Sequence, residues 1–481
     1  MKDLISNKRI LFRIILLAGL IIFTPFYFKI FAQKPVLIEF GWDYPDINQV
    51  SNRIDSMQNT PFDGICISLQ RTIMEAFDTV TKKGNYFEYK KLKSLNWGKY
   101  TDNYFILRGF SKTGGNWFDD KAWIIISKNM ASLSKAMLIG KMKGILFDPE
   151  YYYEDKLYNP WTYSITQYPS KSFEEIQEQV RKRGSQFIIA LQQYKTDLSF
   201  ISIWLTSLIA EEKKYTPFEN TRHALLLSFI EGILLRKNKK VKIIDGNEYA
   251  YWNYKPSQFF ETADFLRKNT FDIMKTNRAK QSVANIEIAQ PIFYDGLLAK
   301  TPSFELGLDN ATKWKWMEEN MKYAIATSGS ITWFYSERLN WWQNKVNDTL
   351  INILQNSKTV FTSPAVAKKN KTLKKEPANP NYNNVNEEKG YFYFANSKTP
   401  MKTGALAFTY KLNTNTKKLN ISFAEKLPAE INVFANNRLS QAIKPINFTE
   451  TLNLKNFSKG KFFILAKYND TLEASAIQIY K

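Results

Sequence analysis

The residues of this chain that are best suited to chemistry are two carboxylates, Asp148 and Glu150, which directly follow a short apolar run. The run 145–147 has the length of a buried strand, and Gly144 separates it from a helix-like stretch. Because residues i and i+2 of a strand share a face, both carboxylates would point the same way from the strand's carboxyl end. The alternative is an N-cap or loop pair beside structural tyrosines.

The chain has one histidine, His223, and one cysteine, Cys66. Multi-histidine zinc or iron sites are therefore excluded, and no disulfide can form within the chain. A Ser-His-Asp triad would have to use His223, which no Gly-x-Ser-x-Gly turn accompanies. We expect no metal and no cofactor, and the chemistry that remains is that of carboxylates, tyrosines and lysines.

The composition combines 481 residues, 44% of them hydrophobic and 15% aromatic, with a net charge of +22. Length and apolar content allow two or three domains with a sizeable core. Trp and Tyr at loop ends suit sugar rings, whereas the same residues could also fill the core. The charge suggests nucleic acid. However, the lysines are spread along the chain and zinc-finger spacing is absent, so we expect no nucleic-acid partner. An acidic polymer ligand stays open.

The N-terminal residues 1–32 have the pattern of a secretory signal. Four basic residues between Lys2 and Arg13 precede the apolar run 14–28, and Ala32 offers a small residue for cleavage. The rival interpretation is an uncleaved membrane anchor, because the apolar run approaches a spanning length. Either one places the rest of the chain outside the cytoplasmic membrane, as a secreted, periplasmic or cell-surface protein. Contact with the membrane would occur only through this segment.

Short apolar runs alternate with helical stretches over residues 33–358. The expected strands are 36–40, 62–69, 103–110, 145–147, 197–204, 240–245, 284–294 and 329–335. The expected helices include 46–57, 119–141, one from Ser172 to about 184 or beyond, 224–236, 256–274, 312–326 and a last one ending near 357. Eight such pairs predict an α/β fold, a (β/α)8 TIM barrel. An open doubly wound sheet is the runner-up, but no Gly-rich phosphate turn follows the first strand.

The C-terminal part has a different pattern. Residues 359–389 are rich in Lys, Asn and Pro and are expected to form a linker. From residue 390 to 481 the apolar period changes to two, which predicts a small all-β sandwich. Its expected strands are 391–394, 405–410, 419–423, 431–434, 462–468 and 474–480.

Polar and aromatic residues gather at the carboxyl ends of five expected barrel strands, where barrel active sites are built. They are Trp42, Asp43, Asp148, Glu150, Tyr151, Asp245, Glu248, Tyr251, Tyr294, Asp295, Tyr335, Glu337 and Trp341. Any one of them could be a cap or a buried hydrogen-bonding group. Several carboxylates with aromatic walls and no histidine favour glycosidic-bond cleavage of a poly- or oligosaccharide, which needs one protonated and one charged carboxyl.

The sequence suggests roles for individual residues in such a reaction. We expect Glu150 to be the general acid, with Phe147 and Tyr151 as partly apolar surroundings that favour its protonated form. Glu248 is the leading second carboxylate, followed by Asp148 and Glu337. Trp42, Tyr251 and Trp341 would stack on sugar rings. Asp43 and Asp295 would bind hydroxyl groups.

Residues 144–151, Gly-Ile-Leu-Phe-Asp-Pro-Glu-Tyr, resemble the strand-four signature of family 18 chitinases, Asp-Gly-x-Asp-x-Asp-x-Glu. The resemblance implies that Glu150 donates a proton and that Asp148 steadies an acetamido group of the sugar. Lys143 and Leu146 stand where the two earlier aspartates of that signature belong. The resemblance therefore implies a secreted barrel glycosidase of an unfamiliar family. Substrate-assisted cleavage of a 2-acetamido sugar is a subordinate hypothesis.

Two other classes of function remain open from the sequence. A non-catalytic surface protein could bind glycans through the same cleft, and a structural protein could retain the barrel without its chemistry. The sequence contains no feature that separates these classes, because an inactive glycosidase can keep most of its aromatic residues.

Overall fold

The computed structural model describes two parts of the chain. It describes residues 36–360, except for 113–115, 154–158, 165, 298–309, 344–345 and nearly all of 207–216 and 254–285, and it describes the strands between 408 and 479. Four expected elements lie outside the described residues. They are the signal or anchor, the linker apart from its start, the strand 391–394 and nearly all of the helix 256–274. Among the described helices none is both long and apolar enough to span a membrane.

The strands of the first part form one sheet of parallel neighbours. They are β1 Val36–Gly41, β2 Gly64–Ile67, β4 Tyr104–Arg108, β5 Gly144–Asp148, β6 Ser199–Ser202, β7 Lys242–Asp245, β8 Ile286–Ile288, β9 Gln290–Phe293 and β10 Ile331–Ser336. Their order is β8-β7-β6-β5-β4-β2-β1-β10-β9, and a short strand β3, Met74–Glu75, pairs with β4. The sequence pattern did not indicate β3, which has only two residues.

The two ends of this sheet are consecutive in the chain, because Ala289 alone separates β8 from β9. The Ala289 N–H donates to Asp245 O at 2.8 Å, and the Gly329 N–H donates to Ile288 O at 2.7 Å. β8 pairs with β7, and β9 pairs with β10. The expected seventh strand is therefore a single strand of the barrel wall, or stave, whose first half pairs with β7 and whose second half pairs with β10. Eight staves thus close into the predicted (β/α)8 barrel.

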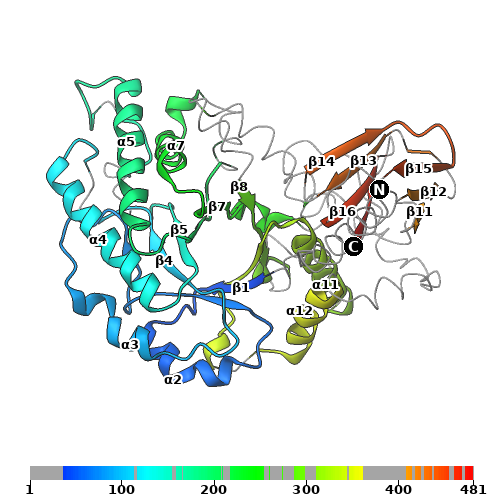
Figure 1. Cartoon of the computed structure of the whole chain (residues 1–481), viewed down its shortest axis with the longest axis horizontal. Helices are drawn as coiled ribbons and strands as arrows, with labels where there is room; N and C mark the ends of the chain where they lie inside the picture. Colours follow the sequence, from blue (N-terminus) through cyan, green and yellow to red (C-terminus); the bar gives the residue numbers. More distant parts are fainter. Residues whose placement is uncertain are drawn as a thin grey trace, which may run out of the picture. The chain divides into compact units, whose positions relative to one another are not determined.

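Helices lie between the strands and around them (Figure 1). They are α2 Ile47–Met57, α3 Tyr89–Ser94, α4 Asp120–Ile139, α5 Phe173–Leu191, α7 Leu226–Arg236, α10 Tyr294–Leu297, α11 Asn310–Thr327 and α12 Asp348–Val360. Short 3-10 helices are η1 Gly84–Phe87, η3 Phe218–Asn220, η4 Glu248–Trp252 and η5 Trp341–Gln343. The predicted capping box between Ser172 and Glu175 is present at the start of α5.

Alternate residues of each strand enter two separate apolar clusters. Ile38, Ile106, Leu146 and Trp333 belong to a cluster drawn from strands and their immediate flanks, which is the barrel interior. Their neighbours along the strands pack with the helices in the outer core. The side of the strand on which a residue lies therefore decides whether it can reach the mouth of the barrel.

Helices α5 and α7 approach each other closely through two glycines. A Cβ on Gly184 would come within 2.1 Å of Phe229 O, and one on Gly232 would come within 2.1 Å of Arg181 O. Only hydrogen at these two positions allows the backbones to touch. The Arg181 Nε also donates to Glu231 Oε2 at 2.9 Å across the same contact.

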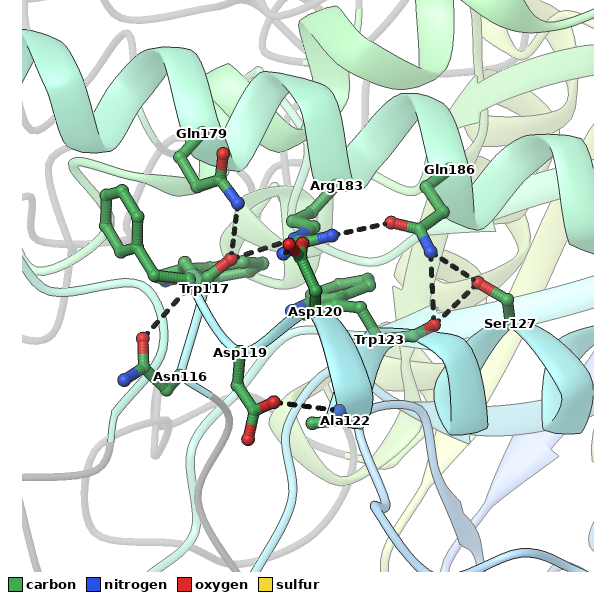
Figure 2. A network of polar contacts seen from close by, with 11 residues as sticks. Asn116, Trp117, Asp119, Asp120, Ala122, Trp123, Ser127, Gln179, Arg183 and Gln186 are labelled. Carbon is green, nitrogen blue, oxygen red and sulfur yellow. Dashed lines mark hydrogen bonds and ion pairs between the residues drawn. The ribbon is translucent and has the colours of Figure 1, made fainter.

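Helices α4 and α5 are joined by a buried guanidinium (Figure 2). The Arg183 Nε donates to Trp117 O at 2.8 Å, Nη1 to Gln186 Oε1 at 2.9 Å, and Nη2 to Asp120 Oδ1 at 2.5 Å. The guanidinium also lies over the Trp123 ring, 5.3 Å from its centroid. Because these partners satisfy the buried cation, this network fixes the two helices to each other.

The second part consists of two antiparallel sheets. One has the order β11-β12-β15 and the other β14-β13-β16-β17. The strands are β11 Phe408–Asn413, β12 Lys418–Phe423, β13 Glu430–Ala435, β14 Arg438–Ile443, β15 Thr449–Asn453, β16 Gly460–Lys467 and β17 Leu472–Ile479. In β12, Leu419, Ile421 and Phe423 are buried in alternation. The mainly polar strands β14 and β15 lacked this apolar alternation and were not predicted. The boundaries of the sandwich domain stay a prediction.

Candidate active site

Asp148 and Glu150 lie at the carboxyl end of β5, on the same side of the chain as the interior residue Leu146. Asp148 Oδ1 accepts the Glu150 backbone N–H at 2.9 Å. The Tyr152 hydroxyl lies 2.9 Å from Asp148 Oδ2 and 2.6 Å from Glu150 Oε2. A phenol has one proton and can donate it to only one of these oxygens. The second contact therefore requires a proton on one of the two carboxyls.

The environment of Asp148 shows where that proton resides. Asp148 is buried, and this burial raises the pKa of its carboxyl to about 7. The charge of Glu150 raises this pKa further, whereas hydrogen bonds from the Glu150 N–H and Tyr152 and the charge of Arg108 lower it. At neutral pH, Asp148 is therefore protonated for a large part of the time. Glu150 is the more accessible of the two.

A third carboxyl, Glu248, lies close to this pair although it follows β7 at the start of η4. Burial raises the pKa of Glu248 well above its usual range, and the charges of Glu150 and Asp148 raise it further. The side chains of Trp204 and Tyr251 face the same carboxyl and favour its charged form to a smaller extent. Burial therefore favours the neutral form of Glu248. Its Oε2 and the Tyr251 hydroxyl are buried without a hydrogen-bond partner among the described residues.

Aromatic side chains border these carboxyls. Tyr251 and Tyr335 stack at 5.0 Å with their planes 8° apart. Phe293 packs against both rings, 5.0 Å from Tyr251 and 5.4 Å from Tyr335. Trp42 forms a hydrogen bond with the Tyr335 side chain, yet 67% of Trp42 is exposed. An exposed indole at the mouth of the barrel offers a flat apolar face to a ligand.

Glu337 lies at the rim of this group. It is exposed at the end of β10, beside the Tyr335 side chain. Partial burial and the charge of Asp295 raise the pKa of Glu337. The structure thus brings six of the expected residues together, on four different staves and their loops. They are Trp42, Asp148, Glu150, Glu248, Tyr251 and Tyr335, with Glu337 beside them.

Two of the expected aspartates hold loops instead of facing the mouth. Asp245 Oδ2 accepts the N–H and hydroxyl of Thr206, at 3.1 and 2.8 Å, and its Oδ1 accepts the Asn247 N–H at 2.9 Å. Asp295 Oδ2 accepts the Ser336 hydroxyl at 3.0 Å and the Glu337 N–H at 2.6 Å. Both are almost fully buried. These bonds give both aspartates a structural role, and their expected contact with substrate stays a prediction.

Tyr294 and Trp341 were expected at the substrate and belong to the outer core. Trp341 is 2% exposed and packs edge-to-face on Phe62 with ring centroids 4.7 Å apart. The Tyr294 ring lies 6.0 Å from Phe334 in the same cluster. Tyr294 begins α10 and Trp341 begins η5, and both pack in the outer core.

Asp43 and Tyr151 also have structural partners. Asp43 Oδ2 accepts the Trp341 N–H at 2.7 Å, and burial raises the pKa of Asp43 to about 6. Tyr151 packs edge-to-face with Phe110 at 5.5 Å. Phe147 lies in the outer core, 5.2 Å from Phe200, so it does not border Glu150 as expected.

Three residues of the site were missed by sequence reasoning. Tyr152 was overlooked in favour of Tyr151, Trp204 was treated only as the end of a strand, and Arg108 was not considered. Arg108 ends β4 and is in register with Asp148. The strand period could have placed Arg108, because it lies two residues after the interior residue Ile106. Among the described residues, no group of three or more His, Cys, Asp or Glu could hold a metal ion.

Comparisons with known proteins give structural likeness only. No protein-family model and no curated protein sequence matches the chain. Similar solved structures include an alpha-amylase from Anoxybacillus (9% identity, 93% of this chain, 99% of that chain, TM-score 0.38). They also include an endo-beta-1,4-mannanase from Cellulomonas fimi (6%, 93% and 95%, 0.35) and a family 5 xyloglucanase from Paenibacillus pabuli (10%, 68% and 99%, 0.37). At these TM-scores the likeness carries no argument about function, which depends on the site itself.

Proposed function

We propose that this protein is a secreted glycoside hydrolase that cleaves a poly- or oligosaccharide with Glu150 and Glu248. The observation that carries the proposal is the meeting of two carboxyls with different surroundings in one site. Burial raises the pKa of Glu248 well above its usual range and so favours its protonated form. Glu150 is less buried, and its Oε2 lies 2.6 Å from the Tyr152 hydroxyl. Glycosidic-bond cleavage requires one protonated and one charged carboxyl.

The two carboxyls divide the chemistry between them. Glu248 donates its proton to the glycosidic oxygen as the bond from that oxygen to the anomeric carbon breaks. Glu150, as the carboxylate, either attacks the anomeric carbon or activates the water that does so. These roles reverse those suggested by the sequence, because burial favours the protonated form of Glu248. Trp42 provides a stacking surface for a sugar ring at the mouth.

The test is hydrolysis by the chain from Gln33 onward, measured as reducing-end release from a panel of polysaccharides. We expect Glu150→Gln and Glu248→Gln each to lower turnover by at least about 100-fold, the contribution of a positioned acid or base. The matched control is Glu219→Gln, an exposed glutamate on η3. On aryl glycosides with acidic leaving groups, Glu248→Gln should recover much of its activity and Glu150→Gln should not. Full activity of Glu150→Gln would refute the proposal.

A non-catalytic glycan-binding protein is the second candidate. The observation that favours it is the burial of Glu248 Oε2, which is not accessible to solvent in this structure. Retention on one glycan without turnover, unchanged by Glu150→Gln, would assign the protein to this class.

A further inference from the structure

We propose that the site recognises an acidic sugar, one that carries a carboxylate or a sulfate, through the guanidinium of Arg108. This inference deepens the proposed function and rests on the same site. Arg108 ends β4 on the interior side of the barrel, and Asp148 is its register partner on β5. Its guanidinium lies over the Tyr152 ring, 5.2 Å from the centroid. Arg108 thus borders the hydroxyl that joins Asp148 and Glu150.

Arg108 has no bonded counter-ion among the described residues. Its Nε is buried and has no hydrogen-bond partner there. None of the ion pairs found in that part of the chain includes Arg108. Arg181 and Arg183, the buried arginines among the described residues, each have an ion pair, with Glu231 and Asp120 respectively. Arg181 also has one buried nitrogen, Nη2, without a partner there, so the feature that distinguishes Arg108 is the lack of an ion pair. A buried donor without a partner is costly.

The nearest carboxyls are already engaged by other donors. Both oxygens of Asp148 accept hydrogen bonds, from the Glu150 N–H and from Tyr152. Glu75, the register partner of Arg108 on β3, accepts the Tyr153 hydroxyl at 2.7 Å and the Lys112 N–H at 2.8 Å. Arg108 is therefore a cation of this site that has no bonded carboxylate among the described residues and can bind an anion from outside.

The chemistry of the guanidinium defines the ligand. Its planar donors match the two oxygens of a carboxylate, or two of a sulfate, in a bidentate geometry. A neutral sugar hydroxyl would give this partly buried guanidinium no bonded anion. The net charge of +22 also attracts polyanions over a longer range. A uronate-containing or sulfated glycan satisfies both features.

The test measures binding separately from turnover. The full chain carrying Glu150→Gln is applied to an array of uronate, sialylated and sulfated oligosaccharides. Each stands beside its neutral counterpart, with the carboxyl reduced or the sulfate removed. Arg108→Gln and Arg108→Lys are added in the same background. The matched control is Arg53→Gln, an exposed arginine on α2. Melting temperatures verify that each variant is folded.

We expect an acidic glycan to bind at least about tenfold more tightly than its neutral counterpart. Arg108→Gln should weaken that binding by about 10- to 100-fold and remove the preference, as loss of one charge-assisted pair would. Arg108→Lys should retain part of the preference for the acidic glycan, and Arg53→Gln should retain all of it. Whether the carboxylated or the sulfated members bind identifies the anion.

The outcomes separate this inference from the proposed function. Binding to neutral glycans alone, binding to no glycan, or an acidic preference that survives Arg108→Gln would overturn the role of Arg108. Turnover of a neutral glycan by the wild type, unaffected by Arg108→Gln, would keep the glycosidase and reject the acidic substrate. Arg108-dependent retention of an acidic glycan that is never cleaved would keep the acidic ligand and reject the glycosidase.

Discussion

At the residue scale, the Tyr152 hydroxyl joins Asp148 and Glu150 with contacts of 2.9 and 2.6 Å. Burial, together with the charges of these carboxyls, raises the pKa of Tyr152 well above its usual range, so the phenol keeps its own proton. The hydrogen bond from Tyr152 also lowers the pKa of Asp148, which burial has raised to about 7. Tyr152 therefore sets how the two carboxyls divide one proton, and we regard it as a positioning residue.

Replacing Tyr152 with phenylalanine tests this role. Loss of the hydroxyl removes a hydrogen bond that favours ionised Asp148, so the pKa of Asp148 should rise above about 7. We expect the inflection of kcat/KM near neutral pH to move upward and activity to fall by about tenfold. The control is Tyr153→Phe, whose hydroxyl binds Glu75 instead. An unchanged pH profile in Tyr152→Phe would contradict the shared proton.

At the scale of elements, the contact between α5 and α7 depends on glycine. The Gly184→Ala substitution places a Cβ 2.1 Å from Phe229 O, a backbone atom that cannot move alone. We expect it to lower the free energy of unfolding by about 1–3 kcal/mol, the usual cost of overpacking. The control is Gly84→Ala, in which the new Cβ meets nothing within 4 Å. Its free energy of unfolding should stay within about 0.5 kcal/mol of the wild-type value. Urea unfolding of both variants measures the difference, and equal stabilities would contradict the close packing.

A buried carboxyl pair connects β1 to η5. Burial raises the pKa of Glu39 well above its usual range, and the adjacent Asp43 raises it further. Asp43, whose pKa burial raises to about 6, accepts the Trp341 N–H. The folded protein holds protons here that the unfolded chain releases above about pH 4.5. This pair therefore stabilises the fold most at low pH, and that contribution is lost as the pH rises through the folded pKa values.

Glu39→Gln isolates this effect, because an amide can donate to Asp43 at every pH. At pH 8 we expect the free energy of unfolding of the variant to exceed that of the wild type by about 1–3 kcal/mol. This is the cost of a buried polar group without its hydrogen bond, which applies to the wild type at this pH. The difference should disappear at about pH 3, where the wild-type carboxyls are mostly protonated in both states. Urea unfolding at both pH values provides the measurement. A difference that does not depend on pH would exclude a shared proton between Glu39 and Asp43.

At the scale of the whole molecule, most of the aromatic residues build the core. Trp117, Trp123, Trp161 and Trp333 are among the largest fully buried side chains. The first three pack around Phe77 outside the barrel strands. The high aromatic content therefore gave little information about sugar binding. Trp42 is exposed, and its stacking on a sugar ring stays a prediction.

The sequence by itself determined the barrel. Apolar runs alternate with amphipathic helices, and each feature is local, so the strands were placed within a few residues of their observed bounds. The same pattern identified Asp148 and Glu150, because two residues on one strand keep a fixed geometry whatever surrounds them. Ser172 and Glu175 were likewise predicted as a cap from their spacing alone.

Only the tertiary structure decided which strand-end residues face one another. Asp245, Asp295 and Trp341 have the same residue types and similar positions as the retained site residues, yet they point into loops or the outer core. Where each side chain points depends on register and on partners more than thirty residues away in the chain. The raised pKa of Glu248 also depends on neighbours from other staves, as does the lack of a bonded partner for Arg108 Nε among the described residues. Burial and charge are properties of the assembled barrel, and no local pattern in the sequence records them.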